Sequence, residues 1–298
     1  MKLNQLKLGS FALASSLFIA SCGGGGQEKS ENASSEFDSA KEQIATDVEK
    51  ILMDLPPPSE VPYLLMAAGA DFDGTIVNSM DKVDSYSSDV SKAALNLGVY
   101  ATDIGYLSSY EKSEMALDYM GESQKLAAPV GVADAIDYGM VARFEKNMEN
   151  KDSLTAVIND VMEKASQRLS ELDQLNNGAL LLAGSWIEGV YISTTIVNNY
   201  PDDLPEESRT LILEPLVKIV IDQKKSLDDL VKIMNDVPGN DSVTSMKAEL
   251  DKIIAIYDGE LAEVSSQISN NTGSFVLKPS TLDNLRAEVT RIRGSIIE

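Results

Sequence analysis

Apolar residues recur at helical spacing along most of the chain, in steps of three and four positions. The strongest run predicts one long helix with a single skipped step near its start: Val83, Val90, Ala94, Leu97, Ala101 and Ile104. Similar runs predict helices over residues 44–52, 59–65, 115–126, 132–144, 153–172, 179–197, 205–220, 226–234, 246–268 and 282–292. The predicted fold class is therefore all-α, a multi-helix bundle of about ten helices.

Proline, asparagine and glycine mark the expected breaks between these helices. Pro56-Pro57-Pro58 ends the first helix, and Asn176-Asn177-Gly178 separates the sixth from the seventh. Ser226 is a candidate cap that would begin a separate ninth helix. The seventh helix is apolar on most faces, so we expect it to be buried at the centre. Phe275-Val276-Leu277 is the one plausible strand, and it has no obvious partner.

A faint internal similarity runs through the chain. The segment Leu97-Gly98-Val99-Tyr100 is followed later by Lys151-Asp152-Ser153-Leu154. The similar segment Ala183-Gly184-Ser185-Trp186 is followed in the same order by Lys225-Ser226-Leu227, but at a different distance along the chain. A diverged tandem of helical hairpins, with a pseudo-repeat boundary near residue 176, fits this pattern. Unrelated hairpins of similar length fit it as well.

The N-terminus has the pattern of a secretory signal. Lys2 and Lys7 precede a short apolar segment, which ends in Ala20-Ser21 and is followed by Cys22, the only cysteine. This arrangement resembles the lipobox of bacterial lipoproteins, in which the cysteine is lipidated, with palmitate among the acyl groups, and becomes the first mature residue. An ordinary cleaved signal with a coincidental cysteine is the alternative. The apolar run is too short to span a bilayer, which needs about 20 residues.

These features predict three regions. Residues 1–21 form the signal peptide, residues 22–35 the lipidated cysteine with a flexible glycine-rich linker, and residues 36–298 the helical domain. The removed segment holds two lysines and no acidic residue, so the net charge changes from −22 to −24. Such a surface repels nucleic acid and attracts cations or basic partners. Charge that only keeps the protein soluble is the simpler alternative.

Composition also limits the chemistry. The chain has no histidine, and Cys22 is the only thiol. Serine–histidine and cysteine–histidine catalysis are excluded, and a metal site would have to consist of oxygen ligands. We therefore expect no enzymatic activity, no cofactor and no metal.

Asp71-Phe72-Asp73-Gly74-Thr75 with Ile76-Val77-Asn78-Ser79 resembles the first motif of the haloacid dehalogenase-like phosphatases. That resemblance implies Asp71 as nucleophile and Asp73 as acid/base, with both near magnesium. The motif belongs at the end of a buried parallel strand, whereas the residues before Asp71 are rich in alanine and favour a helix. A turn between two helices is the alternative.

Two predicted helices each combine small residues, aromatic residues and one carboxylate. Small residues let helix backbones approach closely, and a carboxylate inside such a contact must be paired or hydrogen-bonded. Tyr100 and Asp103 share one helix face, as do Glu188 and Tyr191. A polar ligand or cation pocket between residues 98–106 and 184–191 would use Tyr100, Asp103, Tyr106, Trp186, Glu188 and Tyr191. Local pairing of the carboxylates is the alternative.

The last helix concentrates Arg286, Arg291 and Arg293 in an otherwise acidic protein. We expect it to dock on an acidic face of the remaining helices.

Ala94-Leu95-Asn96-Leu97-Gly98-Val99-Tyr100 with Asp103 and Gly105-Tyr106, followed by Trp186-Ile187-Glu188-Gly189, resembles a group of uncharacterised helical lipoproteins of Bacteroidota. The likeness covers most of the mature chain and carries no known activity. It implies that the phosphatase match is accidental, because that group lacks the aspartates at 71–73. Glycine rather than acidic residues after Cys22 favours an outer-membrane lipoprotein that faces the periplasm.

The expected function is that of a membrane-anchored, acidic, helical envelope lipoprotein. Its partners would be the membrane, through the N-terminal lipid, and an envelope protein, with no nucleic acid. The sequence leaves open a ligand- or cation-binding protein and, more remotely, a phosphatase centred on Asp71.

Overall fold

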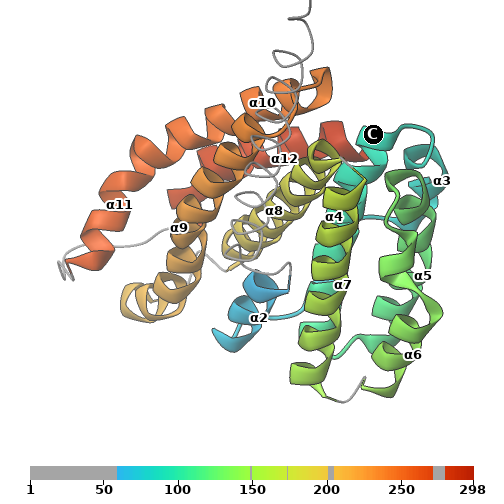
Figure 1. Ribbon diagram of the computed structural model, residues 1–298. Helices are drawn as coiled ribbons and strands as arrows, with labels where there is room; N and C mark the ends of the chain where they lie inside the picture. Colours follow the sequence, from blue (N-terminus) through green and yellow to red (C-terminus); the bar gives the residue numbers. More distant parts are fainter. Residues whose placement is uncertain (1–58, 148–149, 173, 201–204, 271–278) are drawn as a thin grey trace, which may run out of the picture. The chain divides into compact units, whose positions relative to one another are not determined.

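The computed structural model describes residues 59–147, 150–172, 174–200, 205–270 and 279–298. Within these ranges the chain forms eleven α-helices, three short 3-10 helices and no strand, so the predicted all-α fold is confirmed (Figure 1). The elements are α2 (Glu60–Ala67), η1 (Met80–Lys82), α3 (Val83–Tyr86), α4 (Val90–Ser109), α5 (Ser113–Val130), η2 (Ala133–Ile136), α6 (Tyr138–Lys146), α7 (Lys151–Glu171), α8 (Leu175–Asn198), α9 (Glu206–Asp236), α10 (Asp241–Asp258), α11 (Glu260–Ser269), η3 (Pro279–Leu282) and α12 (Asp283–Ile297).

Several predictions lie outside the described residues. These are the signal peptide, Cys22 and its linker, the helix at 44–52, the proline run at 56–58 and the strand at 275–277.

Helix α8 is the central element of the described part, as its apolar composition predicted. It packs against α4, α9, α10 and α12, and most of its residues are buried. By length and composition α8 could cross a membrane, but 72% of its apolar stretch is buried inside the protein. Burial by neighbouring helices accounts for its apolar character.

The other helices pack on the two sides of the α4–α8 pair. Helix α5 packs along α4. Elements η2 and α6 pack against α5, and α7 packs against η2 and α6. Helices α9, α10 and α12 pack on α8 or on one another, and α11 extends from α10 (Figure 1). The N-terminal half of the described chain thus contacts the C-terminal half mainly through α4 and α8.

Side-chain caps explain where several helices begin. Asp89 accepts a hydrogen bond from the Lys92 amide at 2.8 Å, and Asn240 accepts one from Val243 at 2.8 Å. Each cap pairs one of the amides that the first helical turn leaves free. Asp89 also explains why the predicted helix over 83–104 is wrong as one element. Its extended backbone separates α3 from α4, at the place where the hydrophobic pattern skips a step.

The boundary predicted at 176–178 is also wrong. Helix α8 begins at Leu175, so the Asn-Asn-Gly segment forms its first turn. The Asn177 side chain donates a hydrogen bond to Gln174 Oε1 at 3.2 Å, and the first helical turn tolerates such residues. The break between α7 and α8 lies a few positions earlier, between Glu171 and Leu175, close to the proposed repeat boundary near residue 176.

The two helices predicted at 205–220 and 226–234 are one helix, α9. Lysine–aspartate pairs at i, i+4 run past Ser226: Lys218–Asp222, Lys224–Asp228 and Lys225–Asp229. These pairs favour a continuous helix over the serine cap.

Two other predicted helices are divided. Gly259 has a non-helical backbone and separates α10 from α11 inside the predicted 246–268 helix. Asp137 ends η2 and caps α6 by accepting from the Met140 amide at 2.7 Å, which divides the predicted 132–144 helix. A glycine or a capping aspartate inside an apolar pattern marks both breaks.

Candidate functional site

Helices α4 and α8 approach each other so closely at Gly98 and Gly184 that their backbones are in contact. A Cβ atom on Gly98 would lie 1.9 Å from the Leu181 carbonyl oxygen, and one on Gly184 would lie 1.9 Å from that of Leu95. Only glycine permits this approach. The small residues that the sequence analysis singled out are therefore contact residues, as predicted.

The close contact buries an ionic cluster that consists of Asp103 on α4, Glu188 on α8 and Arg293 on α12. Arg293 Nε donates to Glu188 Oε2 at 2.6 Å, and Nη2 donates to Oε1 at 2.7 Å. Both carboxylates are fully buried, and Arg293 is 8% exposed. The two parallel bonds give a bidentate pair, the strongest geometry available to a guanidinium and a carboxylate.

The remaining surface of the Arg293 guanidinium is also engaged. Nη2 donates a second bond to the Ile76 carbonyl oxygen at 3.2 Å. The Tyr191 ring lies below the guanidinium, with 4.0 Å between the central carbon and the ring centroid. A cation over an aromatic face is stabilised further once water is excluded. Arg293 thus connects α12 to α8 and to the segment before η1.

The surroundings of Asp103 favour its neutral form. Burial raises its pKa well above the usual range, the negative charge of Glu188 raises it further, and Arg293 opposes both effects. Oδ2 accepts a hydrogen bond from the Asn78 amide at 3.1 Å. The other oxygen, Oδ1, is buried and has no hydrogen-bond partner among the described residues.

Glu188 carries the negative charge. Burial raises its pKa too, but the attraction and hydrogen bonds of Arg293 lower it. Burial lowers the pKa of Arg293, and the Glu188 carboxylate outweighs that effect, so the net shift is upward. The Glu188 carboxylate and the Arg293 guanidinium form an ion pair, which avoids the high cost of an isolated buried ion.

Tyrosine hydroxyls hold the segment between α2 and η1 next to this cluster. Five hydroxyls contact its backbone: Tyr119 donates to the Asn78 carbonyl (2.6 Å), Tyr100 to Ser79 (2.8 Å), Tyr110 to Ala70 (2.9 Å) and Tyr200 to Gly69 (3.5 Å), and Tyr106 accepts from the Asp73 amide (2.9 Å). Burial raises the pKa of Tyr106 to about 12, so its hydroxyl stays protonated at neutral pH. These contacts satisfy carbonyl and amide groups that no helix pairs.

The structure brings five of the six predicted ligand residues near one another. Tyr100, Asp103 and Tyr106 contact the segment at 70–79, and Glu188 and Tyr191 contact Arg293. Trp186 lies on another face, with its ring 6.5 Å from that of Tyr257 on α10. The cation next to the two carboxylates is an arginine of the chain itself.

Arg293 is the member of the cluster that the sequence analysis did not assign to the site. It predicted only that the last helix would dock on acidic residues, and this prediction is confirmed. Arg291 contacts Glu249 on α10 and Glu288 on its own helix, while Arg293 contacts Glu188. Arg286 pairs with Asp283 within α12.

The phosphatase-like motif lies in a turn. Asp71 is exposed and follows α2 rather than a strand. Asp73 Oδ1 accepts bonds from the Thr75 amide at 2.9 Å and from its hydroxyl at 2.6 Å, which is the geometry of an Asx turn. The parallel sheet that supports this motif in the phosphatases is absent from the described residues.

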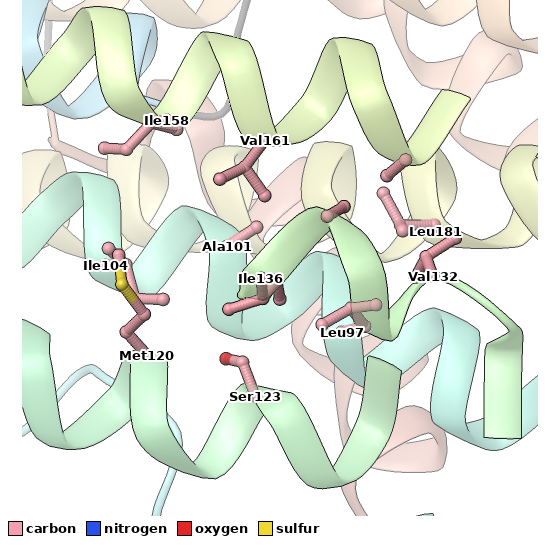
Figure 2. Close-up of a pocket in the computed structure, with 12 residues that line it drawn as sticks. Leu97, Ala101, Ile104, Met120, Ser123, Val132, Ile136, Ile158, Val161 and Leu181 are labelled. Carbon is pink, nitrogen blue, oxygen red and sulfur yellow. The ribbon is translucent and has the colours of Figure 1, made fainter. Parts of the chain in front are cut away.

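An apolar pocket lies on a different face of α4 from the cluster. It has a cavity volume of about 50 Å³ within a hollow of about 560 Å³ that is partly open to solvent (Figure 2). Its lining comes from α4, α5, η2, α7 and α8: Leu97, Ala101, Ile104, Met120, Ser123, Val132, Ala135, Ile136, Ile158, Val161, Ala165 and Leu181.

No protein-family model, curated protein or solved structure matches this chain. Among the described residues, no group of three or more acidic or cysteine side chains is placed to hold a metal ion.

Proposed function

We propose that this chain is a lipid-anchored envelope protein whose helical body contacts other proteins and catalyses no reaction. The observation that carries the proposal is the internal neutralisation of Glu188 by Arg293. Arg293 uses two of its guanidinium nitrogens to bind Glu188, and Asp103 accepts a hydrogen bond from the Asn78 amide. These groups stabilise the packing of α4, α8 and α12, which leaves no charged side chain of the cluster free to act on a substrate.

The anchor rests on the sequence. A basic and apolar segment ends at Ala20-Ser21 before Cys22, and a glycine-rich stretch follows. A lipidated cysteine with such a linker holds a protein at a membrane without fixing its orientation. The outer membrane and its periplasmic side are the location we propose, since acidic residues do not follow Cys22 directly.

The anchor is tested by metabolic labelling with a clickable palmitate analogue in a Gram-negative host. We expect the full chain to be labelled and to fractionate with the outer membrane, and we expect Cys22→Ala to lose both properties. Ser21→Ala provides the matched control, because it keeps both the cysteine and a small residue before it. Equal labelling of the wild-type chain and Cys22→Ala would overturn the anchor.

The interaction role is tested by chemical crosslinking in isolated envelopes, followed by purification of the full chain. The strongly acidic chain favours a basic protein partner. We expect a specific crosslinked band at low salt that disappears at about 1 M salt, where the Debye length is about 3 Å. Absence of any specific band at low salt would contradict the interaction role.

A further inference from the structure

The apolar pocket between α4, α5, η2, α7 and α8 is a second feature, independent of the ionic cluster and of the membrane anchor. We propose that it binds a linear hydrocarbon chain, such as the alkyl chain of a fatty alcohol or fatty acid, with the polar head outside. The inference goes beyond the proposed function, because it requires neither lipidation of Cys22 nor a protein partner.

The chemistry of the lining excludes a polar ligand. Eleven of the twelve lining side chains are hydrocarbon or thioether groups, and Ser123 is the exception. The Ser123 hydroxyl already donates to the Tyr119 carbonyl at 2.8 Å. A polar group that entered the pocket would lose its hydrogen bonds to water and gain none in return. A methylene group has no hydrogen bonds to water to lose, and its burial is favourable.

The shape of the pocket suits a linear chain. Figure 2 shows Ile104 and Ile158 at one end and Leu97 and Leu181 at the other. The lining on α4 runs from residue 97 to residue 104 and that on α7 from 158 to 165. Seven residues of helix span about 10 Å. A narrow hollow of this length between packed helices accepts an extended chain more readily than a broad ring system.

The pocket has an entrance between α4 and α7. Ala101 and Val161 lie across the pocket from each other (Figure 2) and are its half-buried lining residues, whereas the other ten are buried. A chain that enters there keeps its head group in water while its tail lies along Ile104, Met120 and Ile158. Larger side chains at position 101 would close this entrance.

Titration with linear primary alcohols of increasing length tests the proposal. The protein is the full chain with Cys22→Ala, so that no attached lipid competes, and the readout is displacement of cis-parinaric acid, a linear fluorescent fatty acid. We expect affinity to rise about fourfold for each added methylene group, until the chain exceeds the pocket length. Affinity that is independent of chain length would overturn the proposal.

Variants locate the binding. We expect Ala101→Phe to weaken dodecanol binding at least tenfold, and Ala255→Phe, on the exposed face of α10, to leave it unchanged. If Ala101→Phe does not fold, as judged by circular dichroism, Ala101→Leu gives the same comparison. Unchanged binding in a folded Ala101 variant would overturn the assignment.

Discussion

Arg293 and Glu188 lie 105 positions apart in the chain and form a buried bidentate ion pair, with N–O distances of 2.6 Å and 2.7 Å. The pair joins the last helix to the central helix. Asp103, whose pKa burial raises, lies next to the pair and extends the contact to α4 and to Asn78. One set of three side chains thereby connects segments from the beginning, middle and end of the described chain.

The fork geometry of Arg293 predicts that lysine cannot replace it. Lysine keeps the charge but cannot form the two parallel bonds to Glu188 and the bond to Ile76. We expect Arg293→Lys to lower the free energy of unfolding by about 2–4 kcal/mol, as measured by urea denaturation. Arg291→Lys is the matched control, because Arg291 is half exposed and its ion pairs are worth at most about 1 kcal/mol. Equal effects at the two positions would contradict the buried pair.

The raised pKa of Asp103 predicts a pH dependence. Below the unfolded value of 3.8, Asp103 is protonated in both states, and its contribution to stability is intact. As the pH rises from there toward the folded pKa, the unfolded chain loses the proton first, so the folded state loses relative stability. Asparagine does not titrate, so the Asp103→Asn variant loses no stability from this position as the pH rises. The free energy of unfolding of the variant relative to wild type should therefore grow by up to about 1.4 kcal/mol per pH unit, as measured by urea denaturation across pH.

Glu249 provides a control, because its pKa is shifted in the direction opposite to that of Asp103. Hydrogen bonding to Lys252, and then to Arg291, lowers its pKa below the usual 4.5. Its stabilisation is present above pH 4.5 and is lost as the pH falls through the folded pKa. Glu249→Gln should therefore be less stable than wild type at neutral pH and equal to it in acid. A flat difference between Asp103→Asn and wild type over the same range would show that Asp103 is ionised in the folded protein.

The contact between α4 and α8 predicts a sharp difference between two glycines. A Cβ at Gly98 would overlap the backbone of Leu181, so Gly98→Ala should cost about 3 kcal/mol or more. Gly121 lies in α5 with no atom within 4 Å of a built Cβ, so Gly121→Ala should gain about 0.5–1 kcal/mol from helix propensity. Thermal unfolding of both variants checks this. Similar shifts for the two would mean that the helices do not approach at Gly98.

The tyrosine contacts predict that single hydroxyl groups stabilise the segment before η1. Tyr119→Phe leaves the buried Asn78 carbonyl oxygen without this donor, so we expect a loss of about 1–3 kcal/mol. Tyr138, which is 89% exposed, gives the control, because Tyr138→Phe should change stability by less than about 0.5 kcal/mol. Hydrogen exchange of residues 70–79 should accelerate only in Tyr119→Phe. Unchanged exchange would contradict the role of the hydroxyl.

Helical periodicity predicted the all-α fold and the burial of α8, because both follow from the spacing and number of apolar residues. It also placed Tyr100 with Asp103 on one face of α4 and Glu188 with Tyr191 on one face of α8. Helix ends were predicted less well. Ser226 has the residue type of a cap but lies inside α9, where the lysine–aspartate pairs favour continuation.

The partner of Glu188 could not be assigned from the sequence. Arg291 and Arg293 are two positions apart, so they point to nearly opposite sides of α12. Arg291 reaches Glu249 on α10, and Arg293 reaches the buried carboxylate of Glu188. Which of them meets Glu188 depends on how α12 lies against α8, and local spacing does not contain that information.

A double-mutant cycle on Glu188 and Arg293 tests most directly whether the cluster stabilises the fold through an internal pair. Glu188→Met, Arg293→Met and the double variant are compared with wild type by urea denaturation at pH 7. We predict that each single variant loses about 3–5 kcal/mol, because it leaves one buried charge unpaired, and that the double variant loses less than either. Losses that add in the double variant would contradict the account.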